Sequence, residues 1–245
     1  MKITSVQNDL VKETAKLLRG KGRDETGLFL LEGTKGVEEA LNSNLEVVHI
    51  FSISGFDEYP QRIEVTEPVL SKISDAKTPP KVVAVVRKPV FDKKKYAGMK
   101  RVVLLEGIKD AGNLGTILRT ATAFGINGIV LYGETVDLYN PKCVRSAVGN
   151  LWKIPVVHVK DSEELESLFA DFERIATLPA GKDVVSLEDY IPKDKTLVMF
   201  GSEADGLSDE LKHYATKNLT IEMNKNVESL NLSVSAALVM YKLRG

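Results

Sequence analysis

The stretch LEGIKDAGNLGTILRTATAFG, residues 105–125, joins an apolar strand to a helix through a glycine-rich turn. Turns of this kind are typical of nucleotide-binding α/β domains, because glycines let the backbone approach a ligand closely. The glycines are not spaced as the dinucleotide fingerprint G-x-G-x-x-G requires, which disfavours a nicotinamide-dependent Rossmann enzyme. Glu134 ends the next strand, where such an enzyme carries its ribose-binding carboxylate. Without the fingerprint, we interpret Glu134 as a surface carboxylate.

The helix after this turn is expected over residues 113–124, with Asn113 as its N-cap. Its apolar residues share one side of the helical wheel: Leu114, Ile117, Leu118, Ala121 and Phe124. Arg119 is the only charged residue of the helix and points the other way. A solvated helix face usually carries a mixture of Lys and Glu. We therefore expect the flank around Arg119 to be covered by something.

The composition places the chain among soluble proteins of a reducing compartment. The 245 residues include 33 basic and 34 acidic side chains, so net charge does not indicate a nucleic-acid partner. Cys143 is the only cysteine, which excludes an intrachain disulfide and a cysteine metal cluster. No signal peptide or membrane span is evident, and the scattered histidines (His49, His158 and His213) predict neither a metal site nor a triad. We expect a cytoplasmic protein.

Two domains are predicted, over residues 1–90 and 101–245, with a polar, basic linker over 91–100. The first is expected to begin with a helix over residues 3–22 that presents Lys12, Lys16 and Arg19 on one face. Strands over 28–33, 46–51 and 81–89 and a helix near 34–43 follow. In the second domain apolar strands alternate with helices, which predicts an α/β fold with a largely parallel sheet and a ligand site at the carboxyl ends of its strands.

Two further loops carry polar residues in the second domain. In GSEADGL, residues 201–207, Gly201 and Gly206 bracket Glu203, and Ser208 is expected to cap a short helix. In IEMNKNVESLNLSVSAAL, residues 221–238, a strand is expected to end at Met223. Asn231 is expected to open a final helix whose apolar side carries Val234, Leu238 and Tyr241.

Together the three motifs closely resemble the SpoU (TrmH-type) family of RNA ribose 2′-O-methyltransferases, within the SPOUT superfamily. The resemblance covers residues 100–245 and rests on NLGTILRTATAFG at 113–125 with the two loops just described. Residues 1–90 are similar, more weakly, to the small L30e-like substrate-binding domain of many members. FLLEG and KVVAVVRKP are the stretches that match.

The resemblance implies a carboxyl-terminal domain with a deep trefoil knot, one of the rare exceptions to the rule that chains are not knotted. It implies that S-adenosylmethionine lies in this knot, held largely by backbone groups of the last loops. The cofactor-binding positions carried over are Gly201, Ile221, Leu230, Ser229, Phe200, Met223 and Leu178.

The implied reaction is transfer of a methyl group to a ribose 2′-hydroxyl, with large-subunit ribosomal RNA preferred over transfer RNA as the substrate. The resemblance implies that Arg119 is catalytic and that Asn113, Glu203 and Asn231 arrange the site. A guanidinium stays protonated and acts as a donor, so we favour a phosphate clamp with a proton relay over a general base. A non-catalytic RNA-binding protein like L30e is the alternative. Cys143 is a candidate nucleophile for a methyltransferase that acts on a base. No matching acid–base residue is found near it in the sequence, so we interpret it as a small buried thiol.

Two surfaces are expected to bind other molecules. Lys12, Lys16, Arg19 and Arg145 are candidates for contacts with RNA phosphates, which are independent of sequence and sensitive to salt. Helix 113–124 has one charge and the stretch 230–241 has none, which predicts apolar surface for a partner. We expect a homodimer through the carboxyl-terminal domain, as in SPOUT relatives, and no metal or membrane partner.

Overall fold

The computed structural model describes residues 1–224 and 226–244, and these divide into two compact units. One unit comprises Met1–Val90 with Asp137–Gly149, and the other comprises Phe91–Val136 with Asn150–Gly245. This division differs from the expected boundaries, because residues 137–149 join the first unit and residues 91–100 join the second. No helix in the described ranges is long and apolar enough to cross a membrane.

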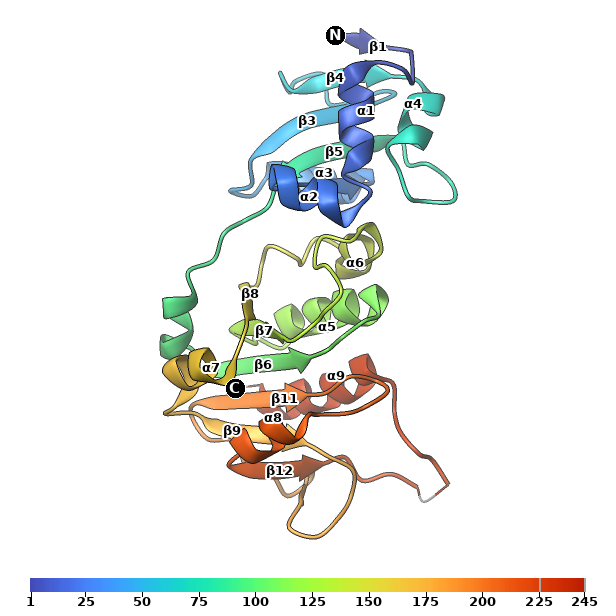
Figure 1. The fold of residues 1–245 in the computed structure, drawn as a ribbon. Helices are drawn as coiled ribbons and strands as arrows, with labels where there is room; N and C mark the ends of the chain where they lie inside the picture. Colours follow the sequence, from blue (N-terminus) through green and yellow to red (C-terminus); the bar gives the residue numbers. More distant parts are fainter. Residues whose placement is uncertain (225, 245) are drawn as a thin grey trace. The chain divides into compact units, whose positions relative to one another are not determined.

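The first unit is built on a mixed sheet, in which five strands of the described chain run in the order β1-β4-β3-β5-β2 (Figure 1). The strands are β1 (Lys2–Ile3), β2 (Leu28–Glu32), β3 (Val47–Ser52), β4 (Arg62–Val65) and β5 (Val82–Arg87). The helices are α1 (Asp9–Lys16), α2 (Gly20–Thr26), α3 (Thr34–Leu41), α4 (Glu67–Lys72) and α6 (Pro141–Ala147). The expected strands and the helix near 34–43 are confirmed, whereas β4 and α4 were not predicted.

The single helix expected over 3–22 is wrong, because residues 2–3 form a strand and two short helices follow it. The side chain of Asn8 caps α1 at its start, and Leu17 is the C-cap after its last residue, Lys16. α2 then packs against the end of α1 so closely that a Cβ at Gly22 would overlap the carbonyl oxygen of Lys16. The apolar residues Val11 and Leu17 are buried against the sheet together with Val69 and Leu70 of α4.

The second unit is built on a parallel sheet, as predicted. Seven strands within the described residues run in the order β10-β12-β9-β11-β6-β7-β8, and every pair is parallel. The strands are β6 (Arg101–Glu106), β7 (Gly128–Tyr132), β8 (Val156–Val159), β9 (Glu173–Thr177), β10 (Val185–Ser186), β11 (Thr196–Phe200) and β12 (Lys217–Thr220). The last of these ends at Thr220, so the expected extension to Met223 is wrong.

One face of this sheet is covered by the 3₁₀ helix η1 (Lys93–Gly98), α7 (Ser162–Phe169) and α8 (Asp209–Tyr214). Tyr96 of η1 is fully buried, and its hydroxyl donates a 2.9 Å hydrogen bond to the carbonyl oxygen of Ile129 in β7. Val102 and Leu104 of β6 belong to the same apolar cluster. The expected linker over 91–100 therefore supplies part of the core of the second unit.

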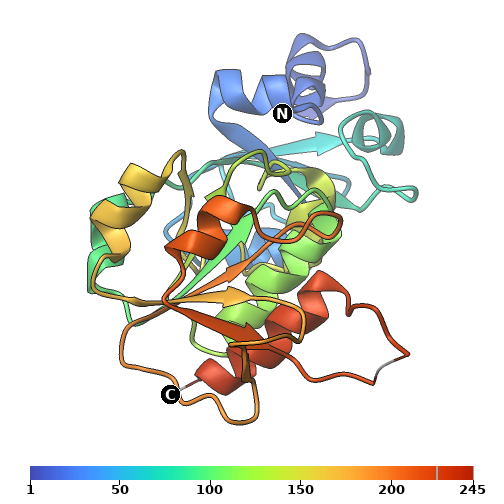
Figure 2. The same cartoon turned by 60° about the horizontal axis from the view of Figure 1, so that its bottom comes forward.

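The other face is covered by α5 (Ala111–Ala123) and α9 (Leu232–Leu243), which lie side by side (Figure 2). The predicted buried side of α5 is confirmed for Leu114, Ile117, Leu118 and Ala121, while Phe124 is half-buried. The rings of Phe124 and Tyr241 meet edge to face at 5.6 Å between centroids. α5 and α9 thereby bring their N-termini to the edge of the sheet where the β-strands end.

The apolar face predicted for α9 is not the one that packs inside the chain. Leu232, Ala236, Val239, Met240 and Leu243 are buried, and Val234, Leu238 and Tyr241 are exposed by 46%, 42% and 50%. The reason is that α9 is apolar on both sides, so the pattern of residues alone does not identify the inner face. The exposed stripe is consequently an apolar surface of the single chain.

Candidate active site

The three sequence motifs lie at one edge of the parallel sheet. β6 leads into the turn 107–110 before α5, β11 leads into the loop 201–208 before α8, and β12 leads into the loop 221–231 before α9. β6 and β11 are neighbours, and β9 lies between β11 and β12. Since the strands are parallel, their carboxyl ends bring all three loops to the same edge.

Asn113, Glu203 and Asn231 form a chain of hydrogen bonds across the three loops. The Nδ2 of Asn113 donates to Oε1 of Glu203 at 2.7 Å, and the Nδ2 of Asn231 donates to Oδ1 of Asn113 at 3.1 Å. Each of these residues was a candidate from the sequence, and the structure brings them together. Asn113 uses both ends of its amide, so it is fixed between a carboxylate on one side and an amide on the other.

Helix caps set the directions of the two asparagines. Asp110, not Asn113, is the N-cap of α5, because its Oδ1 accepts a 2.9 Å hydrogen bond from the backbone N–H of Asn113. This leaves the side chain of Asn113 available for Glu203. Asn231 is the N-cap of α9 as predicted, and its Oδ1 accepts from the N–H and the hydroxyl of Ser233 at 2.9 and 2.6 Å. Its Nδ2 is thereby directed to Asn113.

The loop that carries Glu203 is held closed by its own backbone. The N–H of Ser202 donates to the carbonyl oxygen of Gly206, and the N–H of Gly206 donates back to Ser202, both at 3.1 Å. A Cβ at Gly201 would overlap the carbonyl carbon of Gly206, so this position requires glycine. Ser208 caps α8 as predicted, through Leu211, and its N–H donates to Oε2 of Glu106 at 2.7 Å.

Glu106 was not identified from the sequence, although it is the last residue of a buried strand. Its carboxylate ties the loop 201–208 to the end of β6, beside the turn that carries Asp110. Tyr132, at the end of β7, donates a 3.1 Å hydrogen bond to Oε2 of Glu210 on α8. Burial, followed by the neighbouring carboxylate of Glu210, raises the pKa of Tyr132 to about 12, so the phenol remains a hydrogen-bond donor at neutral pH.

Arg119 is exposed on α5, less than two turns after Asn113. In the ranges 1–224 and 226–244 its guanidinium has no hydrogen bond or ion pair. Within one chain, therefore, its flank is not covered as the sequence predicted. A guanidinium without a protein partner is available to bind an external anion.

The residues expected to bind the cofactor lie on and beside the last loops. Phe200 is buried at the end of β11, Leu178 follows β9 and donates its N–H to Leu219, and Met223 is 39% exposed. Within the described chain, the backbones of Ile221, Ser229 and Leu230 make no hydrogen bond. Backbone groups left free in a loop are suited to bind the polar edges of a nucleoside and an amino-acid carboxylate. These residues fit S-adenosylmethionine.

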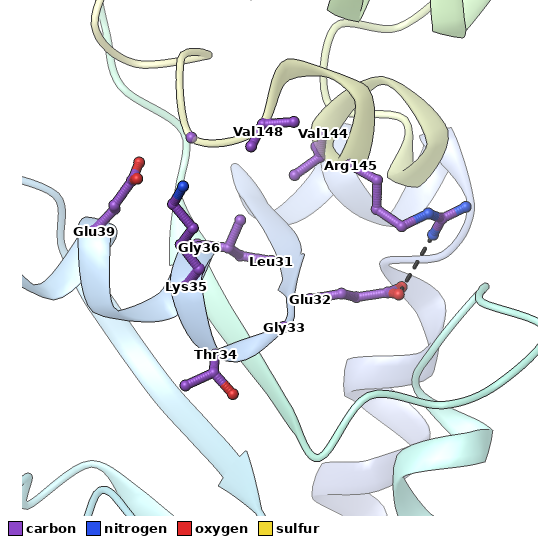
Figure 3. Close-up of a pocket in the computed structure, with 11 residues that line it drawn as sticks. Leu31, Glu32, Gly33, Thr34, Lys35, Gly36, Glu39, Val144, Arg145 and Val148 are labelled. Carbon is purple, nitrogen blue, oxygen red and sulfur yellow. Dashed lines mark hydrogen bonds and ion pairs between the residues drawn. The ribbon is translucent and has the colours of Figure 1, made fainter.

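The four candidate RNA contacts lie in the first unit, and most of them have acidic neighbours. Lys12 lies 3.6 Å from Asp9, and Lys16 lies 2.6 Å from Glu13. The guanidinium of Arg145 contacts Glu32 at 3.4 Å (Figure 3) and Asp75 at 3.1 Å. Arg19 is exposed and has no ion pair among the described residues. The stripe on α1 and α2 is thus a surface of mixed charge.

The structure also bears on the alternative sites. Cys143 is fully buried, and burial raises the pKa of its thiol to about 12, which suppresses the nucleophilic thiolate. Among the residues that the structure describes, no group of His, Cys, Asp and Glu is arranged to hold a metal ion. The hydrogen-bonded residues Glu203, Asn113 and Asn231 therefore remain the candidate catalytic site of the second unit.

Family comparisons agree with this geometry. Residues 100–241 match the model of the SpoU rRNA Methylase family, and residues 8–84 match the MRM3-like substrate binding domain. The chain belongs to the SpoU rRNA methylase family. The turn 107–110 and the loops 201–208 and 221–231 all lie inside the matched region of this SpoU chain.

Relatives and solved structures extend the SpoU assignment over the full chain. The 23S rRNA (guanosine(2553)-2'-O)-methyltransferase RlmP of Bacillus subtilis is 33% identical over 99% of both chains. The AdoMet-bound rRNA methyltransferase of Sinorhizobium meliloti superposes with a TM-score of 0.89 at 27% identity, over 100% of this chain and 97% of the other. The SpoU methyltransferase AviRb of Streptomyces viridochromogenes, in complex with AdoMet, gives 0.84 at 26% identity, over 96% and 97%.

Proposed function

We propose that the chain transfers a methyl group from S-adenosylmethionine to a ribose 2′-hydroxyl of large-subunit ribosomal RNA. The observation that carries the proposal is the hydrogen-bonded chain Glu203–Asn113–Asn231, at the edge of the sheet where the loop 221–231 leaves backbone groups free. The named activities of RlmP and the AdoMet bound to two structural relatives support it.

The residues of the network have separate tasks in this reaction. S-adenosylmethionine supplies the electrophilic methyl group when it is bound. The ribose hydroxyl is a poor nucleophile, so its oxygen needs hydrogen-bond donors while its proton leaves. Glu203 holds the amide of Asn113, and Asn113 in turn holds Asn231, which keeps polar groups oriented at the end of β6 and β11. The new bond joins the ribose oxygen to the methyl carbon, and the carbon–sulfur bond breaks.

Arg119 acts as a phosphate clamp with a role in proton relay. Its guanidinium is exposed and unpaired in the described chain, and it belongs to the same helix as Asn113. A planar guanidinium binds two phosphate oxygens at once, which fixes the backbone next to the target ribose. The clamp brings the 2′-hydroxyl to the donors, and as the methyl group is transferred the guanidinium takes up the hydroxyl proton while it releases one of its own protons to water.

One domain binds the substrate RNA and the other carries out the methyl transfer. Residues 1–90 form an L30e-like domain that binds substrate RNA, in keeping with the match to a substrate binding domain. Residues 101–245 form the catalytic domain, in which the segment after β12 passes into a deep trefoil knot. The return of α9 to the side of α5, while β12 lies three places away from β6 in the sheet, supports this path.

The active form is a cytoplasmic homodimer that associates through α9. Val234, Leu238 and Tyr241 form an apolar stripe on this helix, and the ring of Tyr241 also contacts Phe124 of α5. Apolar surface of this kind is usually covered in a stable protein. A two-fold pair of such stripes covers both copies and brings a second chain beside Arg119.

Calorimetry with S-adenosylmethionine and NAD tests the cofactor and separates the alternatives. We expect binding of S-adenosylmethionine and no binding of NAD. A folded protein that binds NAD contradicts the proposal and restores the Rossmann interpretation. A folded protein that binds RNA but neither nucleotide is a non-catalytic RNA-binding protein.

A further inference from the structure

The first unit contains a cavity of about 270 Å³ between the β2–α3 turn and the segment 144–149. Figure 3 shows Val144, Val148 and Arg145 on one side of it and Leu31, Glu32 and Lys35 on the other. The volume is slightly below the roughly 300–1,000 Å³ of small-molecule sites, which suits one nucleotide better than a large cofactor. Nothing in the reaction described above uses this cavity.

The cavity combines an apolar wall with a free cation. Leu31 and Val144 are buried beneath it, and Val148 keeps 42% of its surface exposed. Lys35 is exposed at its edge and has no ion pair or hydrogen bond within the described residues. An apolar wall accepts the face of a base, and an unpaired ammonium attracts the phosphate attached to it.

Val148 is held in an unusual backbone conformation at this wall. Its φ and ψ of 46° and 57° lie in the left-handed region, which a β-branched residue rarely adopts. Glycine adopts this conformation without strain, and Gly149 follows directly with a φ of 73°. A strained, half-exposed valine is expected where its side chain has a task that glycine lacks.

The carboxylates of the cavity do not prevent an anion from binding. Glu32 is nearly fully buried, and it accepts hydrogen bonds from the hydroxyl of Ser74 and the N–H of Asp75, both at 3.1 Å. Arg145 contacts its carboxylate at 3.4 Å, so the charge is offset inside the protein. Glu39 also lines the cavity. A carboxylate accepts hydrogen bonds from the amino groups of bases, which suits a base in the cavity.

A second cavity, of about 320 Å³, adjoins the first at Thr34. It is lined by Phe56 and Tyr59, whose ring centroids lie 6.2 Å apart, and by the exposed side chains of Lys81, Glu38 and Glu58. Lys81, like Lys35, has no ion pair in the part of the chain that the structure describes. Each of the two adjoining cavities thus has an unpaired lysine beside an apolar or aromatic wall, together with carboxylates that can accept hydrogen bonds from the amino groups of bases.

We propose that these cavities bind two successive unpaired nucleotides of the substrate RNA, one base against Val148 and the next against Phe56 and Tyr59. This inference rests on the proposed function for the choice of RNA. It replaces the stripe Lys12, Lys16 and Arg19 as the principal contact, because two of those three side chains are paired with acidic neighbours. The segment 144–149 is then part of the RNA site.

Binding of a fluorescein-labelled, single-stranded RNA of mixed sequence to the full-length chain tests the proposal. Lys35→Ala is expected to weaken binding roughly fivefold and to reduce the salt slope by about 0.7, as for the loss of one phosphate contact on a single strand. Lys77→Ala is the matched control, because Lys77 is exposed and lines neither cavity. It is expected to bind like the wild type.

Val148→Gly separates binding from folding. Since glycine relieves the left-handed strain, the melting temperature is expected to stay the same or rise, while RNA affinity falls roughly threefold as the apolar wall is lost. Wild-type affinity in both Lys35→Ala and Val148→Gly overturns the proposal. Equal losses in Lys35→Ala and Lys77→Ala also overturn it. RNA binding through the cavities without methyl transfer contradicts the proposed function and leaves the RNA site intact.

Discussion

The side-chain amide of Asn113 donates a 2.7 Å hydrogen bond to Oε1 of Glu203, ninety residues further along the chain. The contact joins the turn after β6 to the loop after β11, and Asn231 extends it to the cap of α9 at 3.1 Å. Asp110 caps α5 in place of Asn113, which frees the amide for this role. Because Asp110 caps the helix, the amide of Asn113 can bond to residues that lie far away in the sequence.

Asn113→Asp replaces the amide donor with a second carboxylate next to Glu203. Two carboxylates at this distance repel each other, so the pKa of the pair rises and one proton is shared at lower pH. The shared proton restores a hydrogen bond, and activity relative to the wild type is expected to increase as pH falls. Methyl transfer measured across a pH series for both proteins checks this. A ratio that does not change with pH would show that the Asn113–Glu203 contact has no part in catalysis.

Arg119→Ala is expected to lower methyl transfer by roughly 10²–10³-fold, the loss typical of one donor in a transition state. Arg119→Lys is expected to be nearly as poor, because an ammonium lacks the planar pair of donors. The affinity for S-adenosylmethionine should remain that of the wild type, since the later loops bind it. Turnover close to normal in either variant would make Arg119 an ordinary surface residue.

Gly201→Ala is expected to abolish cofactor binding. The added methyl group overlaps the backbone of Gly206, so the loop 201–206 has to move away from its hydrogen bonds. Gly98→Ala is the control, because Gly98 has an ordinary φ and no atom within 4 Å of the added Cβ. Calorimetry with S-adenosylmethionine compares the two. Equal affinity in both variants would exclude the loop 201–206 from the cofactor site.

Leu238→Glu is expected to convert the dimer to a folded monomer, because it places a charge in the apolar stripe of α9. Val90→Glu is the control, since Val90 is 95% exposed and belongs to the other compact unit. Sedimentation velocity of the full-length proteins distinguishes them. A Leu238→Glu protein that remains dimeric rules out this stripe as the interface.

Cys143 is expected to resist alkylation in the native protein. Burial and, to a smaller extent, the charge of Asp137 raise the pKa of its thiol to about 12, so the thiolate is scarce at about pH 8. The thiol should react with iodoacetamide after unfolding in guanidinium, where its pKa returns to the ordinary value of about 8.5. Mass spectrometry of both samples checks the result. Rapid labelling of the native chain would show that the thiol is accessible and would revive it as a candidate nucleophile.

The sequence predicted the parallel sheet because its strands are apolar throughout and each is followed by a polar loop or helix. The same reasoning failed at KKKYAG, residues 93–98, where the charged residues obscure the one side chain that matters. Tyr96 is buried and anchors η1 to β7, so the segment is part of the core. Burial of this one aromatic side chain places the segment in the core although lysines precede it, one of which, Lys93, pairs with Glu164 at 2.6 Å.

Other features depend on contacts that no local pattern contains. α9 is apolar on both faces, and only its packing on the sheet decides that Val239 is inside and Leu238 outside. Asp137 was unremarkable in sequence, yet it forms an ion pair of 2.6 Å with the buried Arg23 and ties residues 137–149 to the first unit. The active-site residues Asn113, Glu203 and Asn231 were identified because the loops and helix starts that carry them resemble the motifs of the SpoU family.

Ribose methylation by this protein is tested by incubating the purified chain with S-adenosylmethionine and large-subunit ribosomal RNA from cells that lack its gene. The RNA is then digested to nucleosides and analysed by mass spectrometry, with Asn113→Ala in parallel. We predict that the wild type adds methyl groups to ribose at the 2′-oxygen and that Asn113→Ala loses this activity while remaining folded. Methyl groups found on the bases would contradict ribose methylation, and ribose methylation that persists in Asn113→Ala at the wild-type rate would contradict the role of the Asn113 network.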